Sequence, residues 1–302
     1  MKILFATDGS EFSESAARFL TRMEWSPDDS ITVFHSIYEV PFRSDEQFYL
    51  TTLAAIKKEL APRIIDSALA ILQPIRATVS AQIRESSPLR CTPEQCIIDE
   101  AEALRADLIV MGARGIKGIA SIFLGSVTRL VTLQAKRPVL VVKPSERTAA
   151  DRLKILFAVD GSDDSLYTGE FLSSLPFPGT TEVTILNVIA SSFTDIPAHF
   201  AMEVNEQIKK VVADARSIEY AQSKQILDHA GDTLRKRFSR IEVVSTVGDP
   251  STEILALGGK IGADIIAVGS RGLRGIKGVL GSISRNILTH SKCSVLIGNR
   301  RT

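Results

Sequence analysis

The sequence predicts a duplicated α/β protein in which each half forms a doubly wound parallel sheet with helices on both faces. The first observation is an internal repeat: residues 2–10 read KILFATDGS, and residues 154–162 read KILFAVDGS. The second is that short runs rich in Val, Ile and Leu alternate with helical patterns in both halves. Such runs are typical of parallel strands buried on both faces. Because the period is about half the chain, the repeat indicates a domain duplication and not a short-repeat solenoid.

Apolar periodicity and turn signals place the elements of the first half. Strands are expected at residues 3–7, 31–37, 81–85, 107–111 and 139–142. Helices are expected from a cap at Ser10 or Ser13 to Met23, over residues 46–77, from Pro93 through Ala101, and over residues 126–135. Strands and helices that alternate in this way build βαβ units with right-handed crossovers.

The second half is expected to follow the same course. Strands are expected at residues 154–159, 182–189, 241–247, 264–269 and 294–298, and helices at 163–174, 200–237, 251–261 and 282–291. Residues 144–152 are polar and lack periodicity, so they are expected to be the linker. The domains are therefore expected at residues 1–146 and 152–302.

The composition is typical of a soluble globular protein, with 44% apolar and 24% charged residues. The net charge of +1 argues against a nucleic acid or an anionic membrane held by bulk charge. No apolar run reaches ~18 residues, so we expect no membrane span. The first ten residues enter a strand without the layout of a signal peptide, and the expected compartment is the cytoplasm.

The three cysteines are Cys91, Cys96 and Cys293. An odd, low count does not suggest a disulfide framework. Cys91 and Cys96 have four residues between them and no nearby histidine or second cysteine pair that would complete a metal site. We therefore expect reduced, structural thiols in preference to a metal or redox role.

Each half contains one glycine loop, and these loops are the strongest functional signal. The first reads MGARG at residues 111–115, then nine residues, then GSVT at 125–128; the second reads VGSRG at 268–272, then eight residues, then GSIS at 281–284. A strand that runs through glycines into a helix is suited to phosphate, because backbone N–H groups can approach the anion and the helix N-terminus adds unpaired donors. The alternative is that the glycines only make turns and that the loop cations are solvated. These cations are Arg114, Lys117, Arg271, Arg274 and Lys277.

An aspartate follows the first strand of each half, Asp8 and Asp160. It can accept hydrogen bonds from ribose hydroxyls or lie near a phosphate-bound cation. Alternatively it caps the following helix, since Asp-Gly-Ser is a good turn. In a doubly wound sheet of order 3-2-1-4-5, the ends of strands one and four flank the switch point where ligands bind. We therefore expect Asp8 to meet Gly112, and Asp160 to meet Gly269, in one cleft per half.

Other site classes lack their motifs in this sequence. The loops are neither a Walker A motif nor Gly-x-Gly-x-x-Gly with a downstream acid. No His-Glu-x-x-His pattern, paired metal ligands or nucleophile elbow is found. His35 lies within an expected strand, where it is expected to be packed. No residue is identified as a catalytic base.

The spacing Gly-x2-Gly-x9-Gly-Ser after a strand, with Asp-Gly-Ser ending strand one, resembles the universal stress protein family. The resemblance covers both halves, as in tandem-domain members of the ATP-binding type. It implies two Rossmann-like, adenine nucleotide alpha hydrolase-like domains, each with a five-stranded parallel sheet of order 3-2-1-4-5. Many members with this loop bind ATP or AMP, and members without it do not. The implied cofactor is ATP, ADP or AMP, with Mg²⁺ possible beside ATP.

The resemblance also implies which positions bind the nucleotide. In the first half they are Ala6, Thr7, Asp8, Ser36, Met111, Gly112, Arg114, Gly115, Gly125, Ser126, Val127 and Thr128. In the second half they are Ala158, Val159, Asp160, Val188, Val268, Gly269, Arg271, Gly272, Gly281, Ser282, Ile283 and Ser284. The residues near the first two strands would lie beside adenine and ribose, and those of the glycine loops would line ribose and phosphates.

The halves depart from the family pattern in different places. The second loop is one residue short, and the first half has Ser36 at an adenine-contact position that is often valine, as at Val188. The turn Gly248-Asp249-Pro250 resembles the family's turn before its third helix, whereas the first half has Arg90-Cys91-Thr92-Pro93. Unequal affinities are therefore expected.

In the family, the last strands pair across a dimer interface. Here residues 138–142 and 293–297 are expected to pair within one chain as a pseudo-dimer, because an unprotected sheet edge usually finds a partner. A homodimer of the whole chain is implied by the family alone. The leading hypothesis is a nucleotide-dependent binding or signalling module in the stress response. The alternatives are a slow ATPase or nucleotide-transfer enzyme, and an interaction protein with empty clefts.

Overall fold

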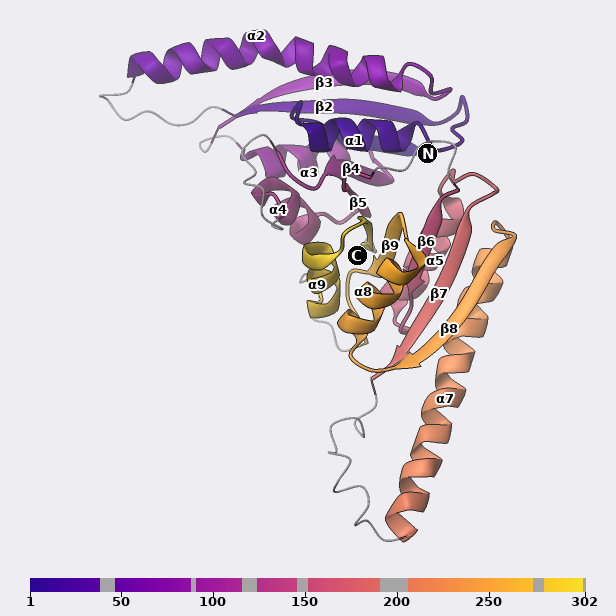
Figure 1. Ribbon diagram of the computed structural model, residues 1–302. Helices are drawn as coiled ribbons and strands as arrows, with labels where there is room; N and C mark the ends of the chain where they lie inside the picture. Colours follow the sequence, from indigo (N-terminus) through magenta and orange to yellow (C-terminus); the bar gives the residue numbers. More distant parts are fainter. Residues whose placement is uncertain are drawn as a thin grey trace.

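A computed structural model describes residues 1–38, 47–87, 91–115, 124–145, 152–190, 206–273 and 280–300. Ten strands form one sheet in the order β3-β2-β1-β4-β5-β10-β9-β6-β7-β8. Each half therefore has the expected 3-2-1-4-5 order, and the two halves share a continuous sheet (Figure 1).

The first half supplies β1 to β5 and α1 to α4. Its strands are β1 (Lys2–Ala6), β2 (Ser30–Tyr38), β3 (Thr78–Ser86), β4 (Leu108–Gly112) and β5 (Val139–Val142). Its helices are α1 (Glu11–Leu20), α2 (Gln47–Leu72), α3 (Pro93–Ala103) and α4 (Ser126–Gln134).

The second half repeats this order. Its strands are β6 (Lys154–Ala158), β7 (Glu182–Ile189), β8 (Arg240–Val247), β9 (Ile265–Gly269) and β10 (Ser294–Gly298). Its helices are α5 (Asp163–Ser174), α7 (Glu206–Arg235), α8 (Pro250–Ile261) and α9 (Ser282–His290).

The two halves join where β5 pairs antiparallel with β10, with Leu140 opposite Leu296. Both leucines are buried. Nζ of Lys143, just after β5, donates to the carbonyls of Leu288 and Ser291 at the end of α9. Burial lowers the pKa of Lys143 to about 8. The electrostatic interaction with Cys293 raises this pKa, and the weaker one with Arg114 lowers it. The expected pairing of the last strands is confirmed, and it makes the chain a pseudo-dimer.

Burial on both faces of the sheet explains the unbroken apolar strands. Leu4 and Phe5 are adjacent and point to opposite faces, yet both are fully buried. Phe5 belongs to the core cluster that α1, α2, α5 and α7 cover, and Leu4 to the cluster under α3, α4, α8 and α9. The outermost strands differ, because most side chains of β3 and β8 are exposed. Each half thus has the expected layers.

Several bounds differ from the sequence-based expectation. Helix α1 ends at Leu20 and not at Met23, because the indole N–H of Trp25 donates a hydrogen bond of 2.7 Å to the Leu20 carbonyl. Helix α2 ends at Leu72, two residues before Pro74, since the residue before a proline disfavours helix. Strand β3 is longer than expected because it pairs with β2 along its full length. Parts of two expected elements, residue 46 and residues 200–205, and most of the linker, residues 146–151, lie outside the described residues.

In the described part of the chain, none of the helices combines the length and the apolar character that a membrane span needs.

Candidate functional site

The aspartate after strand one and the glycine loop meet in each half, as expected. Strands β1 and β4 are neighbours, and Ala6 pairs with Met111. Asp8 Oδ1 accepts from both N and Oγ of Ser10, at 3.1 and 2.6 Å. Ser10 Oγ also lies 3.3 Å from the carbonyl oxygen of Arg114. Ser10 thus connects the carboxylate after β1 to the backbone of the loop after β4.

The second half repeats this network atom for atom. Asp160 Oδ1 accepts from N and Oγ of Ser162, at 3.0 and 2.5 Å. Ser162 Oγ lies 3.2 Å from the carbonyl oxygen of Arg271. The N-caps of α1 and α5 are Ser10 and Ser162, each accepting from a backbone N–H three residues later. The two aspartates therefore orient the capping serines instead of capping the helices themselves.

Gly115 and Gly272 lie against these carboxylates. A Cβ added at Gly115 would lie under 3.0 Å from Asp8 Oδ2, closer than real Cβ atoms come to a neighbour. A Cβ added at Gly272 would lie 2.8 Å from Asp160 Oδ2. Oδ2 of Asp160 also accepts from the backbone N–H of Leu273 at 3.2 Å. Glycine is thus required where the loop backbone meets the acid. We call this place, where the glycine-loop backbone lies against the carboxylate after strand one, the cradle of each half.

Gly112 and Gly269 have a different reason to be glycine. A Cβ at Gly112 would lie 2.6 to 2.8 Å from backbone atoms of Phe12 and Ser13. A Cβ at Gly269 would lie 2.9 Å from the backbone N of Ser165. These are contacts with the first turn of α1 and α5, so packing of helix on strand explains these two glycines.

The starts of α4 and α9 face the same end of the sheet. Gly125 and Gly281 are the N-caps, and neither helix start receives a side-chain hydrogen bond at its cap. The N–H of Gly125 donates to Ala113 O at 2.9 Å, which draws the helix start back to the loop. Ser126 and Ser282 are exposed at these helix starts, whereas Thr128 and Ser284 are buried.

Thr128 and Ser284 anchor the helices to the strands. Thr128 Oγ1 donates to Gly112 O at 2.9 Å, and Ser284 Oγ donates to Gly269 O at 2.6 Å. Val127 and Ile283 are half-buried and pack against the core under α3, α4, α8 and α9. Met111 and Val268 are buried in the same core.

The ends of β1 and β2 are tied together beside the cradle. His35 is buried, and its Nδ1 hydrogen-bonds to Thr7 O at 2.8 Å. In the second half, Asn187 Nδ2 donates to Val159 O at 2.7 Å. The expectation that His35 is packed is confirmed, and asparagine performs the same structural role in the other half. Ala158 is half-buried and Ala6 is buried at the strand ends.

Both halves of the chain resemble proteins of one family. A family model described as the universal stress protein family matches residues 1–143 and 152–298. The chain belongs to this family. The universal stress protein YxiE of Bacillus subtilis is 32% identical over 154 residues, covering 48% of this chain and 97% of its own. A universal stress protein of Mycolicibacterium smegmatis is 30% identical over 169 residues, covering 54% of this chain and 55% of its own.

A solved structure extends the likeness to the whole fold. A universal stress protein from Archaeoglobus fulgidus covers 100% of this chain and 98% of its own length, with a TM-score of 0.62 and 24% identity. The expectation of a tandem universal stress protein is therefore confirmed: two family segments lie in one chain.

The loop arginines separate the two halves of this universal stress protein. Arg271 is held by Asp164, with Nε 2.7 Å from Oδ2 and Nη2 3.0 Å from Oδ1. Ser270 Oγ adds a third hydrogen bond to Asp164, at 2.6 Å. Burial by itself raises the pKa of Asp164, but the hydrogen bonds from Arg271 and Ser270 outweigh it, and the pKa lies below its ordinary value. The same pairing raises the pKa of Arg271.

In the first half, Phe12 replaces this acid. The Arg114 guanidinium carbon lies 5.5 Å from the centre of the Phe12 ring. A cation over an aromatic face is held more weakly than one in a bidentate ion pair within a partly buried site. The sequence does contain the difference, as Phe12 against Asp164, but neither position belongs to a site motif. The other loop cations, Lys117, Arg274 and Lys277, lie outside the described residues.

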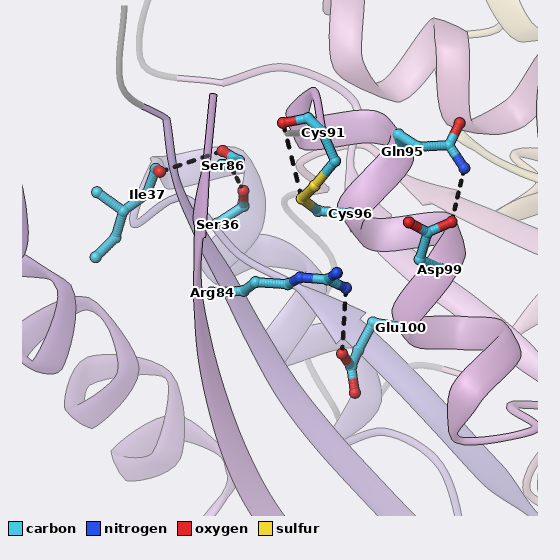
Figure 2. Close-up of a disulfide and its surroundings, with 9 residues drawn as sticks. All are labelled: Ser36, Ile37, Arg84, Ser86, Cys91, Gln95, Cys96, Asp99 and Glu100. Carbon is cyan, nitrogen blue, oxygen red and sulfur yellow. Dashed lines mark hydrogen bonds and ion pairs between the residues drawn. A yellow bond between two sulfur atoms is a disulfide. The ribbon is translucent and has the colours of Figure 1, made fainter. Parts of the chain in front are cut away.

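The expectation of reduced thiols at Cys91 and Cys96 is wrong. The structure joins them in a disulfide with a Cα–Cα distance of 5.9 Å (Figure 2). The reason is local: Cys91 is held by a bridge to Ser87, and Pro93 begins a helix whose fourth residue is Cys96. The short spacing thus brings the two sulfurs together. Cys293 is free, and burial raises the pKa of its thiol.

The described residues contain no cluster of three His, Cys, Asp or Glu side chains that could hold a metal ion. A cavity of about 270 Å³ lies between the halves, lined by Arg18, Arg22, Lys143 and Asp264 among others. It is not formed by the residues of either glycine loop.

Proposed function

We propose that this universal stress protein binds an adenine nucleotide, ATP in preference to ADP or AMP, in one or both halves. It would act as a nucleotide-dependent module of stress response or signalling in the cytoplasm. The observation that carries the proposal is the duplicated network in which Asp8 or Asp160, a capping serine and the glycine-loop backbone meet at one point. The proposed domains are residues 1–146 and 152–302.

The residues fit a phosphorylated ligand. At Gly115 and Gly272 the cradle has no room for a Cβ, so the loop backbone itself lines it. The starts of α4 and α9 add N–H groups and the positive end of each helix dipole. Ser126 and Ser282 stand exposed at these starts, where their hydroxyls can donate to phosphate oxygens.

The sugar and base have candidate positions on the neighbouring strands. Asp8 and Asp160 keep Oδ2 on the side of the loop glycines, where it can accept from ribose hydroxyls. Adenine would lie beside Ala6, Thr7 and Ser36 in the first half and beside Ala158, Val159 and Val188 in the second. Mg²⁺, if it accompanies ATP, would be held chiefly by the phosphates and water. Its role there is to neutralise phosphate charge.

The two clefts are proposed to differ in affinity. Arg271 is already paired with Asp164, so a phosphate would compete with that carboxylate for it. Arg114 faces the Phe12 ring instead. Ser36 hydrogen-bonds Ser86, whereas Val188 offers adenine an apolar contact. The two halves thus differ in the residues at both the phosphate end and the base end of the cleft.

Analysis of co-purified ligand tests this function. The protein is purified without added nucleotide, denatured by heat, and the supernatant is analysed by mass spectrometry. We expect an adenine nucleotide at a stoichiometry between one and two per chain. If the supernatant holds no nucleotide and the protein takes up none on incubation with ATP, the clefts are empty and the proposal fails.

A steady-state ATPase assay separates a binding module from the enzyme alternative. No side chain in the described part of either cleft is placed as a general base. We therefore expect turnover well below ~1 s⁻¹, the low end of ordinary enzymes. Turnover at or above that rate identifies an ATPase and overturns the binding-module assignment.

A further inference from the structure

The Cys91–Cys96 disulfide joins the connection before α3, which is longer than its counterpart in the second half, to the first turn of α3. Arg84 pairs with Ser36, and Thr246 pairs with Val188, so these two strand positions correspond. Eight residues separate Arg84 from Pro93 at the start of α3. Only three separate Thr246 from Pro250 at the start of α8. The first half therefore carries five additional residues between its third strand and third helix, and the disulfide lies at the end of this insertion.

In both halves, this turn contacts the fourth residue of the following helix. In the second half that residue is Glu253, whose Oε2 accepts from Thr246 Oγ1 at 3.3 Å. A Cβ at Gly248 would lie 2.9 Å from Glu253 Cγ, so the turn packs directly on this side chain. In the first half the corresponding residue is Cys96, and the tie is covalent. Because the second half folds the same way with non-covalent contacts, the fold does not need the disulfide.

A short chain of contacts leads from the disulfide to the adenine end of the first cleft. Cys91 forms an antiparallel bridge with Ser87. The adjacent Ser86 is buried, and its Oγ donates to Ile37 O at 3.1 Å. Ser36 Oγ donates to Ser86 Oγ at 2.8 Å, as Figure 2 shows. Three links, Cys91 to Ser87, Ser87 to Ser86 and Ser86 to Ser36, thus connect the disulfide to the proposed adenine-contact position.

The two sulfurs differ in access. Cys96 is fully buried in the core under α3 and α4. Cys91 is half-buried and packs against the same core. As the less buried residue of the pair, Cys91 is the one that we expect a reagent from solution to reach first, with Cys96 as its resolving partner. One accessible sulfur beside a buried resolving partner is the arrangement that redox-active pairs use.

We propose that Cys91 and Cys96 form a reversible dithiol–disulfide site, whose oxidised state holds the adenine end of the first cleft in its binding geometry. The reactants are a peroxide as oxidant and a dithiol as reductant. The control of binding rests on the proposed nucleotide function; the redox chemistry does not. In a reducing compartment, such a pair is a reversible switch and not a permanent cross-link.

The chemistry balances in both directions. In oxidation, the Cys91 thiolate attacks one peroxide oxygen, the O–O bond breaks, and a sulfenic acid and water form. The Cys96 thiolate then attacks this sulfur and expels the second oxygen as water, so two thiols and one H₂O₂ give one disulfide and two waters. In reduction, one thiolate of the dithiol attacks the Cys91 sulfur and releases Cys96. Its second thiol then releases Cys91 and leaves as a cyclic disulfide.

The redox chemistry is tested on the native full-length chain. Dithiothreitol is added without denaturant, free thiols are alkylated, and the intact mass is measured. We expect two additional alkylations relative to the untreated protein, and their loss after hydrogen peroxide. Cys293→Ser serves as the control and should leave this difference unchanged. If the pair resists reduction until the protein is unfolded, or does not reform with peroxide, the site is not reversible and the proposal is overturned.

The control of binding is tested with labelled ATP in a Gly272→Val background, which leaves the first cleft as the measured site. We expect the reduced protein and the Cys91→Ser/Cys96→Ser variant to bind about fivefold more weakly, or worse, than the oxidised protein. Equal affinity in both redox states overturns the control while leaving the nucleotide function intact. Absence of ATP binding in every state, with normal redox cycling, overturns the nucleotide function of the first half together with the control.

Discussion

Gly115 offers a sharp perturbation of the proposed nucleotide cradle. In Gly115→Ala, the added Cβ overlaps Asp8 Oδ2, so the carboxylate must rotate or the loop must retreat. Rotation removes Oδ1 from N and Oγ of Ser10, two hydrogen bonds at 3.1 and 2.6 Å. Hydrogen bonds to a charged group contribute about 1.5–3 kcal/mol each. With partial replacement by water, we expect the free energy of unfolding to fall by about 1–3 kcal/mol.

Nucleotide affinity should fall with it. Displacing the carboxylate and the loop should weaken binding by about 1.4 kcal/mol, which raises the dissociation constant tenfold. The assay is calorimetric titration of ATP into Gly115→Ala and into Gly179→Ala, whose added Cβ meets nothing within 4 Å. We expect weaker binding in the first variant and wild-type binding in the second.

A double-mutant cycle with Asp8→Ala isolates the cause. If the overlap with the carboxylate is responsible, Gly115→Ala should destabilise the Asp8→Ala protein far less than the wild type. Additive losses, or a Gly115→Ala protein that matches Gly179→Ala in both stability and binding, would refute the reasoning.

Three further outcomes follow from the fold. Gly112→Ala should lose about 1–3 kcal/mol of stability in urea unfolding, because its Cβ meets helix backbone. Gly259→Ala, whose Cβ lies in open space within α8, should gain up to about 1 kcal/mol in the same measurement. The Asp164 pKa is depressed, so its ion pair stabilises the protein above pH ~4, and that stability is lost as the pH falls through the folded-state pKa. Asp164→Asn should therefore be less stable at pH 7 by about 1–3 kcal/mol and approach the wild type as the pH falls through the folded-state pKa; a deficit that does not shrink on acidification would contradict this. Leu140→Ala should lower the free energy of unfolding by about 2–5 kcal/mol. Because β5 and β10 join the halves, the unfolding midpoints measured by Trp25 fluorescence and by far-UV circular dichroism should shift together. Separated midpoints would count against the continuous sheet.

The sequence was informative where a pattern had one physical solution. Apolar runs without alternation indicated strands buried on both faces, and Leu4 and Phe5 show why: both neighbours are buried on opposite sides. The repeated Asp-Gly-Ser and glycine loops predicted that Asp8 and the glycine loop would converge, since the ends of strands one and four are adjacent in this topology. The family resemblance, supported by the unprotected edge expected of each last strand, predicted the β5–β10 pairing.

The missed features depend on contacts between residues that no local pattern links. Asp164 and Arg271 are 107 residues apart, and only the fold shows that one neutralises the other. The Cys91–Cys96 disulfide was missed for the opposite reason. The cysteines are close in sequence and the helix from Pro93 was predicted, but the bridge that places Cys91 beside Ser87 has no local signal. The end of α1 is set by a side-chain donor beyond the helix, the Trp25 indole, which the apolar pattern does not show.

Equilibrium binding of labelled ATP tests the central claim most directly. Wild-type protein is compared with the Gly115→Val/Gly272→Val variant, in which both cradles are filled, and with Gly179→Val as the control for adding a side chain. Thermal unfolding of each protein establishes that it is folded. We predict saturable binding by the wild type and the control, and loss of binding in the double variant. Absence of binding by the wild type, or undiminished binding by a folded double variant, would contradict the assignment of the nucleotide to these clefts.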